Sequence, residues 1–315
     1  MTDITHPILV TGAHRSGSTW AGKMLAADSQ TAYISEPLNV LHRPGVYGAK
    51  VKYWYQYICD ENEGDYLHAF HQLLDFDYHL LDAIRSIRSP KDFLRMGRDF
   101  TIFYNALMRG QRALIKDPFA VFSAQWFAKK LNCRVVVTVR HPAAFVSSLQ
   151  RLGWSFDFND LLNQPLLMRD HLEKYRDEML STKADDVIGQ ASLLWKMIYA
   201  SVHSTLRHAQ GGARELNPDQ ITVRHEDLSR DPVNRYRDLY SKLDLEFTPR
   251  VQKFIENASS SENPTELSRK KTHSVKLDSL ANIKNWKKRL SEEDIRRIHR
   301  MTDDTSHLYY SDEEW

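Results

Sequence analysis

The residues best suited to chemistry lie in a short glycine-containing loop near the N-terminus. The apolar run Ile8–Thr11 passes into the sequence GAHRSGST and then into a helix-like segment. Gly12 and Gly17 permit backbone angles that let amide groups converge on an anion, and the following helix adds its N-terminal dipole. The side chains expected to bind the anion are Arg15, Ser16, Ser18 and Thr19. The loop is therefore predicted to hold a phosphate or sulfate group, with an ordinary strand–helix turn as the alternative.

The loop resembles a Walker A motif but departs from it at one position. Ser18 stands where that motif requires a lysine to neutralise the β- and γ-phosphates of a nucleoside triphosphate. The substitution argues against a kinase or ATPase, and Arg15 supplies a basic residue three positions earlier.

A second anion site is predicted at the end of a later strand. The apolar run Arg134–Val139 is followed by Arg140, then by Pro142 at the expected first position of a helix that contains Ser148. An arginine at a strand end and a serine eight residues later can bind one phosphate from two sides. A surface-capping arginine is the alternative interpretation of Arg140.

These motifs are predicted to lie on an α/β fold with an open, mostly parallel, P-loop-like sheet flanked by helices. Five apolar runs read as strands covered on both faces: Ile8–Thr11, Thr31–Ile34, Ala113–Ile115, Arg134–Val139 and Ile221–Arg224. Helices are expected over Ser18–Asp28, over Ala191–His208 and from Ser291, where Asp294 completes a capping-box pattern.

We expect residues 1–315 to form a single domain with two insertions. Residues 43–112 are aromatic and histidine-rich, and residues 152–190 are largely polar. Because ligands of α/β folds bind at the carboxyl ends of the strands, both insertions are expected to cover the active site and contact an acceptor.

The net charge and the cysteines of the chain argue against several classes of protein and partner. The net charge of +2 provides no global basic field for nucleic acid or an anionic membrane, so any anion site is local. Cys59 and Cys133 lack the spacing of a zinc site or a disulfide framework, which favours a reducing compartment. The sequence shows no signal peptide and no apolar run long enough for a transmembrane segment, so a cytoplasmic enzyme is expected; its oligomeric state is not indicated.

The two anion motifs together resemble the superfamily of sulfotransferases that use 3′-phosphoadenosine 5′-phosphosulfate (PAPS). Arg15 to Trp20 (RSGSTW) matches its [KR]-x-G-[ST]-[ST] loop, and Arg140 with Ser148 matches its later Arg/Ser pair in type and spacing. The resemblance implies that the loop binds the 5′-phosphosulfate and the pair binds the 3′-phosphate. Weaker agreement extends over Arg224–Leu228 and Trp286–Leu290. RSGSTW followed by SEPLNV is closest to carbohydrate sulfotransferases, which implies a glycan or another polar hydroxyl acceptor.

The resemblance also implies catalytic roles. Arg15 and Lys116 are candidate cations beside the transferred sulfuryl group, with a surface lysine as the alternative for Lys116. Cytosolic relatives place a histidine base where this chain has Pro118, whereas glycan-modifying relatives use a glutamate after the second strand, a position that Glu36 occupies. His14 and Asp117 remain alternative bases. The transfer itself requires no metal.

Three further residues complete the predicted nucleotide site. Trp20 is expected either to stack on the adenine or to be an ordinary core residue. Arg269 and Lys270 resemble a mobile basic segment that closes over the 3′-phosphate in relatives, although the glycine of that segment is missing here; a solvated run of charge is the alternative. A nucleoside-triphosphate enzyme and a non-catalytic nucleotide-binding protein remain the competing functions.

Overall fold

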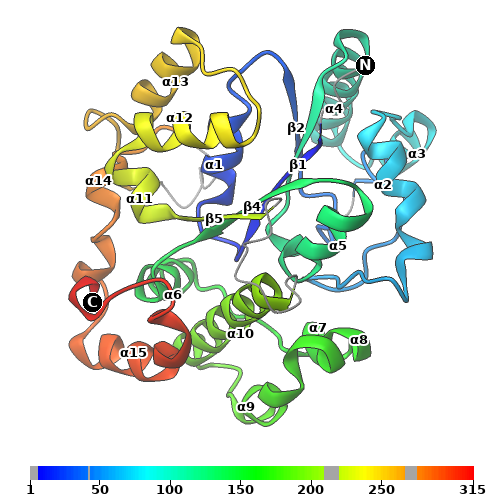
Figure 1. The fold of residues 1–315 in the computed structure, drawn as a ribbon. Helices are drawn as coiled ribbons and strands as arrows, with labels where there is room; N and C mark the ends of the chain where they lie inside the picture. The colour runs from blue at the N-terminus through cyan, green and yellow to red at the C-terminus, as the bar shows by residue number, and fades with distance from the viewer. Residues whose placement is uncertain (1–5, 42, 209–219, 267–274) are drawn as a thin grey trace.

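A five-stranded, entirely parallel sheet forms the centre of the molecule. The computed structural model describes residues 6–41, 43–208, 220–266 and 275–315. The strand order is β2-β3-β1-β4-β5, so β1 is central (Figure 1). The strands are β1 (Ile8–Gly12), β2 (Thr31–Ser35), β3 (Arg112–Lys116), β4 (Arg134–Val139) and β5 (Gln220–Arg224). All five agree with the predicted runs to within one residue at each end, and the predicted fold class is confirmed.

Successive residues of the central strands enter two different cores. Ile8 and Val10 of β1 pack with α1 (Ser18–Leu25), α11 (His225–Arg230), α12 (Pro232–Lys242) and α13 (Pro249–Ser259). Leu9 faces the opposite core, which includes α5 (Ala124–Lys130), α6 (Pro142–Leu152), α10 (Val187–His208) and α15 (Glu292–Ser306). Because both faces are covered, the strands read in sequence as continuous apolar runs without alternation.

The remaining helices lie largely within the two segments expected to be insertions. Between β2 and β3 are α2 (Leu67–Leu74), α3 (Leu80–Ser86) and α4 (Pro90–Arg109). Between α6 and α10 are α7 (Asn159–Leu162), α8 (Pro165–Leu167), a π-helical turn (Met168–Leu172) and α9 (Arg176–Ser181). The short helix α14 (Ser279–Asn282) precedes α15. None of the helices among the described residues is long and apolar enough to cross a membrane.

Local signals account for where several helices begin and end. Ser291 accepts a hydrogen bond from the backbone N–H of Asp294, and the Asp294 carboxylate accepts from Ser291, which confirms the predicted capping box of α15. The helix predicted from Ser18 ends at Leu25 rather than Asp28, because Asp28 instead caps the start of β2 by accepting hydrogen bonds from Thr31. Gly110 and Gly153 end α4 and α6 in the left-handed conformation.

All five strands end at the same edge of the sheet, and each end supplies a polar residue there. The glycine loop follows β1, Glu36 follows β2, Lys116 ends β3, Arg140 follows β4 and His225 follows β5. The parallel topology therefore brings together side chains that are more than 200 residues apart in the sequence.

The glycine loop depends on a close approach between β1 and β4. Gly12 has a φ of 133°, and a Cβ atom there would lie 2.3 Å from the carbonyl oxygen of Thr138. We expect Gly12→Ala to lower the free energy of unfolding by about 2–4 kcal/mol, because it combines backbone strain with overpacking. Urea unfolding would measure the loss. Gly64→Ala, where nothing lies within 4 Å of a new Cβ, should change stability by less than about 0.5 kcal/mol; equal losses would contradict the account.

Candidate active site

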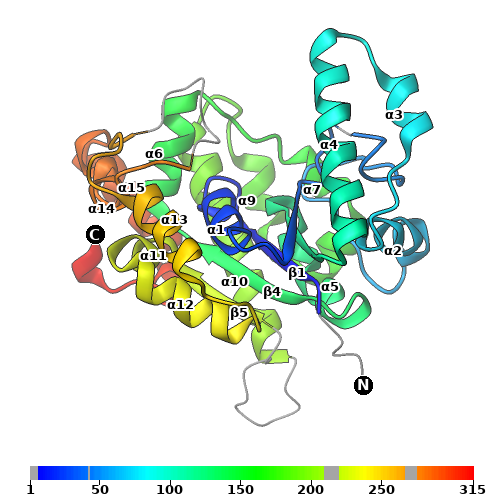
Figure 2. The ribbon, with the colours of Figure 1, turned by 90° about the horizontal axis from the view of Figure 1, so that it is seen from above.

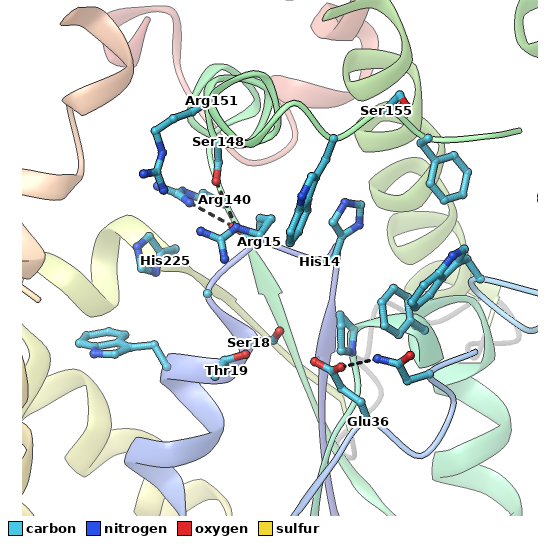
Figure 3. A pocket seen from close by; sticks show the side chains of 18 of the residues that line it. His14, Arg15, Ser18, Thr19, Glu36, Arg140, Ser148, Arg151, Ser155 and His225 are labelled. Atoms are coloured by element: carbon cyan, nitrogen blue, oxygen red, sulfur yellow. Dashed lines mark hydrogen bonds between the residues drawn. The ribbon is translucent and has the colours of Figure 1, made fainter. Parts of the chain in front are cut away.

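A cavity of about 680 Å³ opens at the carboxyl edge of the sheet. The glycine loop, the start of α6 and the residues after β2 and β5 contribute to its walls, as do residues from both helical segments, among them Trp54 and Phe156. Figure 3 shows arginine side chains gathered at one end and Glu36 at the other, with Ser18 and Thr19 between them. The cavity therefore has a cationic end and a carboxylate end.

The two predicted anion motifs touch each other at the cationic end. Arg140 donates a hydrogen bond from Nη1 to the carbonyl oxygen of Arg15 (3.1 Å), and Arg15 donates from Nε to Ser148 Oγ (3.2 Å) (Figure 3). Burial, together with the nearby charges of Arg140 and Arg151, lowers the pKa of Arg15 to about 10. Positive charges held this close in a buried site favour a bound anion.

Two further arginines extend this cationic end. Arg151, one turn after Ser148 on α6, and Arg289 line the cavity. Both form ion pairs with Glu266, at 2.9 Å from Arg151 Nε and 2.6 Å from Arg289 Nη2. A single carboxylate thus lies between two guanidinium groups on the cavity wall.

Several buried polar atoms of the described cavity residues have no hydrogen-bond partner. Two of them are Nε of Arg140 and Nε2 of His225. Burial, and then the charge of Arg140, lowers the pKa of His225 to about 3, so its imidazole is neutral at pH 7. Because unpaired buried polar atoms are costly, a ligand that accepts hydrogen bonds here fits the site.

The remaining loop residues divide between the cavity and the sheet. Ser18, Thr19 and Trp20 line the cavity. Trp20 also belongs to a hydrophobic core and packs edge-on against His225 and Tyr236. The prediction that Ser16 offers its hydroxyl group to the anion is wrong. Ser16 is fully buried, and its Oγ lies 2.7 Å from Thr138 Oγ1, so it ties the loop to β4.

At the opposite end, Glu36 is held in a fixed position. Its φ of 54° is in the left-handed region, its Oε1 pairs with Lys116 Nζ, and its Oε2 accepts a hydrogen bond from Asn39 Nδ2 at 2.8 Å. Lys116 is 1% exposed and stands behind Glu36, away from the cavity wall. The expectation that Lys116 contacts the transferred group directly therefore needs correction, because it acts on the cavity through Glu36.

The alternative bases occupy different environments. His14 lines the cavity, and its Nδ1 lies 2.6 Å from the hydroxyl group of Tyr55. Burial lowers the pKa of His14 to about 4, so the ring is neutral at pH 7 but is a weaker base than an exposed histidine. Asp117 is completely buried, and its two oxygens accept hydrogen bonds from the backbone N–H groups of Leu38 and Phe119. Asp117 thus stabilises the loops on either side of the cavity and does not line it.

Aromatic side chains cover the carboxylate end of the cavity. Trp54 and Phe119 pack with their ring centres 4.5 Å apart, and Phe156 approaches from the segment after α6. Trp154, from the same segment, instead lies against Arg15, with the guanidinium carbon 5.9 Å from the ring centre. Polar residues that also line the cavity include Asn39, Ser155, Asp157 and Asp160. This wall combines flat apolar faces with hydrogen-bonding groups.

The structure also identifies cavity residues that the motif analysis missed. Arg151 lies three residues after Ser148 on one helix, so helical spacing could have predicted its position. Arg289, Glu266 and His225 come from segments far apart in the sequence, and their convergence follows from the fold alone. Arg269 and Lys270 lie outside the described residues.

The sheet, its glycine loop and its cationic cavity make up the P-loop-like α/β fold predicted from the sequence. A family model described as a sulfotransferase family matches residues 7–249, more than half of the chain. The chain therefore belongs to the sulfotransferase family and is a sulfotransferase, which confirms the resemblance at the level of the superfamily.

The chain is also similar to solved structures of low sequence identity. They include the sulfotransferase domain from the curacin biosynthetic pathway, with 16% identity, a TM-score of 0.48 and coverage of 98% of this chain and 99% of that chain. Sulfotransferase STF9 from Mycobacterium avium has 13% identity and a TM-score of 0.46, covering 98% and 78%. Mouse sulfotransferase SULT7A1 complexed with PAP has 11% identity and a TM-score of 0.46, covering 98% and 86%. No curated protein matched the sequence.

The buried His225 makes stability depend on pH in a defined direction. Its pKa falls from 6.5 to about 3 on folding, so between these values the unfolded state binds more protons and acid favours unfolding. When the pH is lowered from 7 to 5, the free energy of unfolding of the wild type should fall because His225 resists protonation in the folded state. In His225→Asn this fall should be smaller by about 2 kcal/mol. Urea unfolding at the two pH values measures this difference. Identical losses in the two proteins would show that His225 is not the buried neutral group described.

Proposed function

We propose that the protein transfers a sulfuryl group from PAPS to a hydroxyl group of a glycan or another polar acceptor. The observation that carries the proposal is the contact between the two anion motifs, in which the Arg140 guanidinium folds onto the carbonyl of Arg15. One nucleotide with phosphate groups at both its 5′ and 3′ positions can contact both motifs in a single cavity.

The donor is expected to be held by residues from three strand ends. The backbone amides of the loop, with Arg15, Ser18 and Thr19, would bind the 5′-phosphosulfate. Arg140 and Ser148 would bind the 3′-phosphate, and Arg140 Nε and His225 Nε2 are buried atoms still able to meet an acceptor. Trp20 would pack beside the adenine.

Transfer would proceed by an in-line displacement at sulfur. The acceptor oxygen forms a bond to sulfur while the bond from sulfur to the 5′-phosphate oxygen breaks, and the leaving bisphosphate keeps that electron pair. Glu36, which carries negative charge as the partner of Lys116, takes the acceptor proton as the new bond forms. The charge of Arg15 stabilises the departing phosphate.

The acceptor is expected to bind at the carboxylate end. Aromatic faces such as Trp54 and Phe119 pack against sugar rings, and Asn39, Asp157 and Asp160 offer partners for hydroxyl groups. We also propose that the chain acts as a single domain, with residues 43–112 and 152–190 as insertions that shape this acceptor side.

The role of Arg140 predicts selective nucleotide recognition. We expect adenosine 3′,5′-bisphosphate at 100 times its Kd to stabilise the wild type by about 2.7 kcal/mol, visible as a rise in Tm. Arg140→Ala should weaken binding of this bisphosphate by roughly tenfold to a hundredfold, because a charge-assisted hydrogen bond is lost, and should change AMP binding little. Titration calorimetry would measure both affinities.

The exposed Arg300 provides a control with the same change in charge, and Arg300→Ala should bind both nucleotides like the wild type. Equal losses for the bisphosphate and AMP would remove Arg140 from the 3′-phosphate site. Stabilisation by ATP with Mg²⁺ but not by the bisphosphate would overturn PAPS as the donor.

The role of Glu36 predicts a loss of turnover without a loss of donor affinity. Glu36→Gln keeps the shape of the side chain but removes its charge, so we expect kcat to fall about 10²–10⁴-fold with the bisphosphate Kd unchanged. Turnover would be followed by transfer of labelled sulfate from PAPS to a panel of glycans and small hydroxyl compounds.

His14→Gln is the matched comparison for the base. If His14→Gln abolishes transfer while Glu36→Gln does not, His14 is the base and the assignment of Glu36 is wrong. Nucleotide binding without transfer to any acceptor would instead indicate a non-catalytic binding protein.

A further inference from the structure

The charged residues of the cavity are divided by sign between its two ends. Of the described residues that line the cavity, the basic ones are the arginines of the cationic end: Arg15, Arg140, Arg151 and Arg289. Among the acidic ones, Glu266 is paired with two of these arginines. The others are Glu36, Asp157 and Asp160. Among the described residues, therefore, the rest of the cavity wall carries acidic side chains and no lysine or arginine.

Asp157 and Asp160 lie beside the aromatic wall of the carboxylate end. Asp160 accepts a hydrogen bond at Oδ1 from the backbone N–H of Trp54 (3.3 Å), and Asp157 directly follows Phe156. Asp160 belongs to α7, whereas Arg151 belongs to α6, and Figure 2 shows these two helices on opposite sides of α1. The two aspartates therefore line the same part of the cavity as the aromatic rings, and not the part lined by α6.

Neither aspartate has a cationic partner in the part of the chain that the structure describes. Asp157 Oδ1 accepts a hydrogen bond from the backbone N–H of Asn159 (2.9 Å), and Asp160 is held by the bond from Trp54. Burial raises the pKa of Asp160, and the negative charge of Asp157 raises it further. Glu36 differs, because Lys116 forms an ion pair with it. A cation bound beside the two aspartates would neutralise charge that the described residues leave unbalanced.

The aromatic rings of this wall favour the same kind of ligand. Trp54, Phe119 and Phe156 are each half-buried and line the cavity. The face of an aromatic ring attracts a cation, so an ammonium group beside both a ring and a carboxylate interacts favourably with each. His14 adds no positive charge here, because its ring is neutral at pH 7. Rings and carboxylates together are therefore suited to an organic cation.

We propose that the acceptor carries a positively charged amino group in addition to the hydroxyl group that is sulfated, as amino sugars do. This inference rests on the proposed sulfuryl transfer and specifies its acceptor. The ammonium group binds at Asp157 and Asp160 beside the Trp54 ring, while the hydroxyl oxygen attacks sulfur and its proton passes to Glu36. An ammonium nitrogen has no lone pair, so oxygen and not nitrogen receives the sulfuryl group. The arginines of the cationic end repel the ammonium group, which leaves the acceptor one orientation.

Binding of matched sugars tests the proposal. The probes are glucosamine against glucose and galactosamine against galactose, because each pair differs only in an ammonium group in place of a hydroxyl group. Titration into the protein saturated with adenosine 3′,5′-bisphosphate should show at least about tenfold tighter binding of the amino sugar in one or both pairs. Asp157→Asn/Asp160→Asn removes both charges but keeps an oxygen for each backbone hydrogen bond, and it should lower this preference about tenfold. With labelled PAPS, the product should carry its sulfate on oxygen.

Asp177→Asn/Asp185→Asn is the matched control. Both residues are exposed, lie in the same segment of residues 152–190 and are not among the residues that line the cavity, so the preference for amino sugars should equal that of the wild type. Unchanged Tm values and bisphosphate affinity would show that each variant is folded.

Three results would overturn the amino acceptor and leave sulfuryl transfer standing. They are equal binding of the sugars with and without the amino group, an equal loss of preference in the control variant, and sulfate on the nitrogen of the product. A wild type that does not bind the bisphosphate would instead overturn the proposed function, and this inference with it.

Discussion

The site depends on positive charge that is buried at the carboxyl edge of the sheet. Arg15 and Arg140 are held together by the bond from the Arg140 guanidinium to the Arg15 carbonyl, and burial lowers the pKa of each. The fold makes this possible, since β1 and β4 are neighbours and Gly12 lets their ends approach closely. Two buried cations held close together without a ligand repel each other and destabilise the protein. An anion that binds between them relieves this repulsion, which favours its binding.

Glu266 balances part of the positive charge at the cationic end of the cavity. Its carboxylate lies between Arg151 and Arg289 and neutralises part of a cluster that would otherwise be more strongly repulsive. At the other end, Lys116 does the same for Glu36. The arginines at one end and the carboxylate of Glu36 at the other are each held in place by an ion pair. The cavity is therefore positively charged at one end and negatively charged at the other.

Sequence reasoning located the elements better than it located the side chains within them. All five strands could be predicted because burial on both faces leaves continuous apolar runs, and the loop and the Arg140–Ser148 spacing follow directly from local sequence. Whether Ser16 faces the ligand or the sheet depends on Thr138, which lies on another strand. The place of Lys116 behind Glu36 depends in the same way on the register of β2 and β3, where Ser35 pairs with Lys116. Such facts come from tertiary packing.

Helix α4 and the carboxylate end of the cavity are physically connected. Arg43 forms an ion pair with Asp99 of α4 at 2.8 Å and donates a hydrogen bond to the carbonyl of Ser35, the residue before Glu36. Asp99 is buried on the packed side of α4, so this link lies inside the protein. The ion pair therefore fixes the packing of α4 relative to the strand end that carries the proposed base.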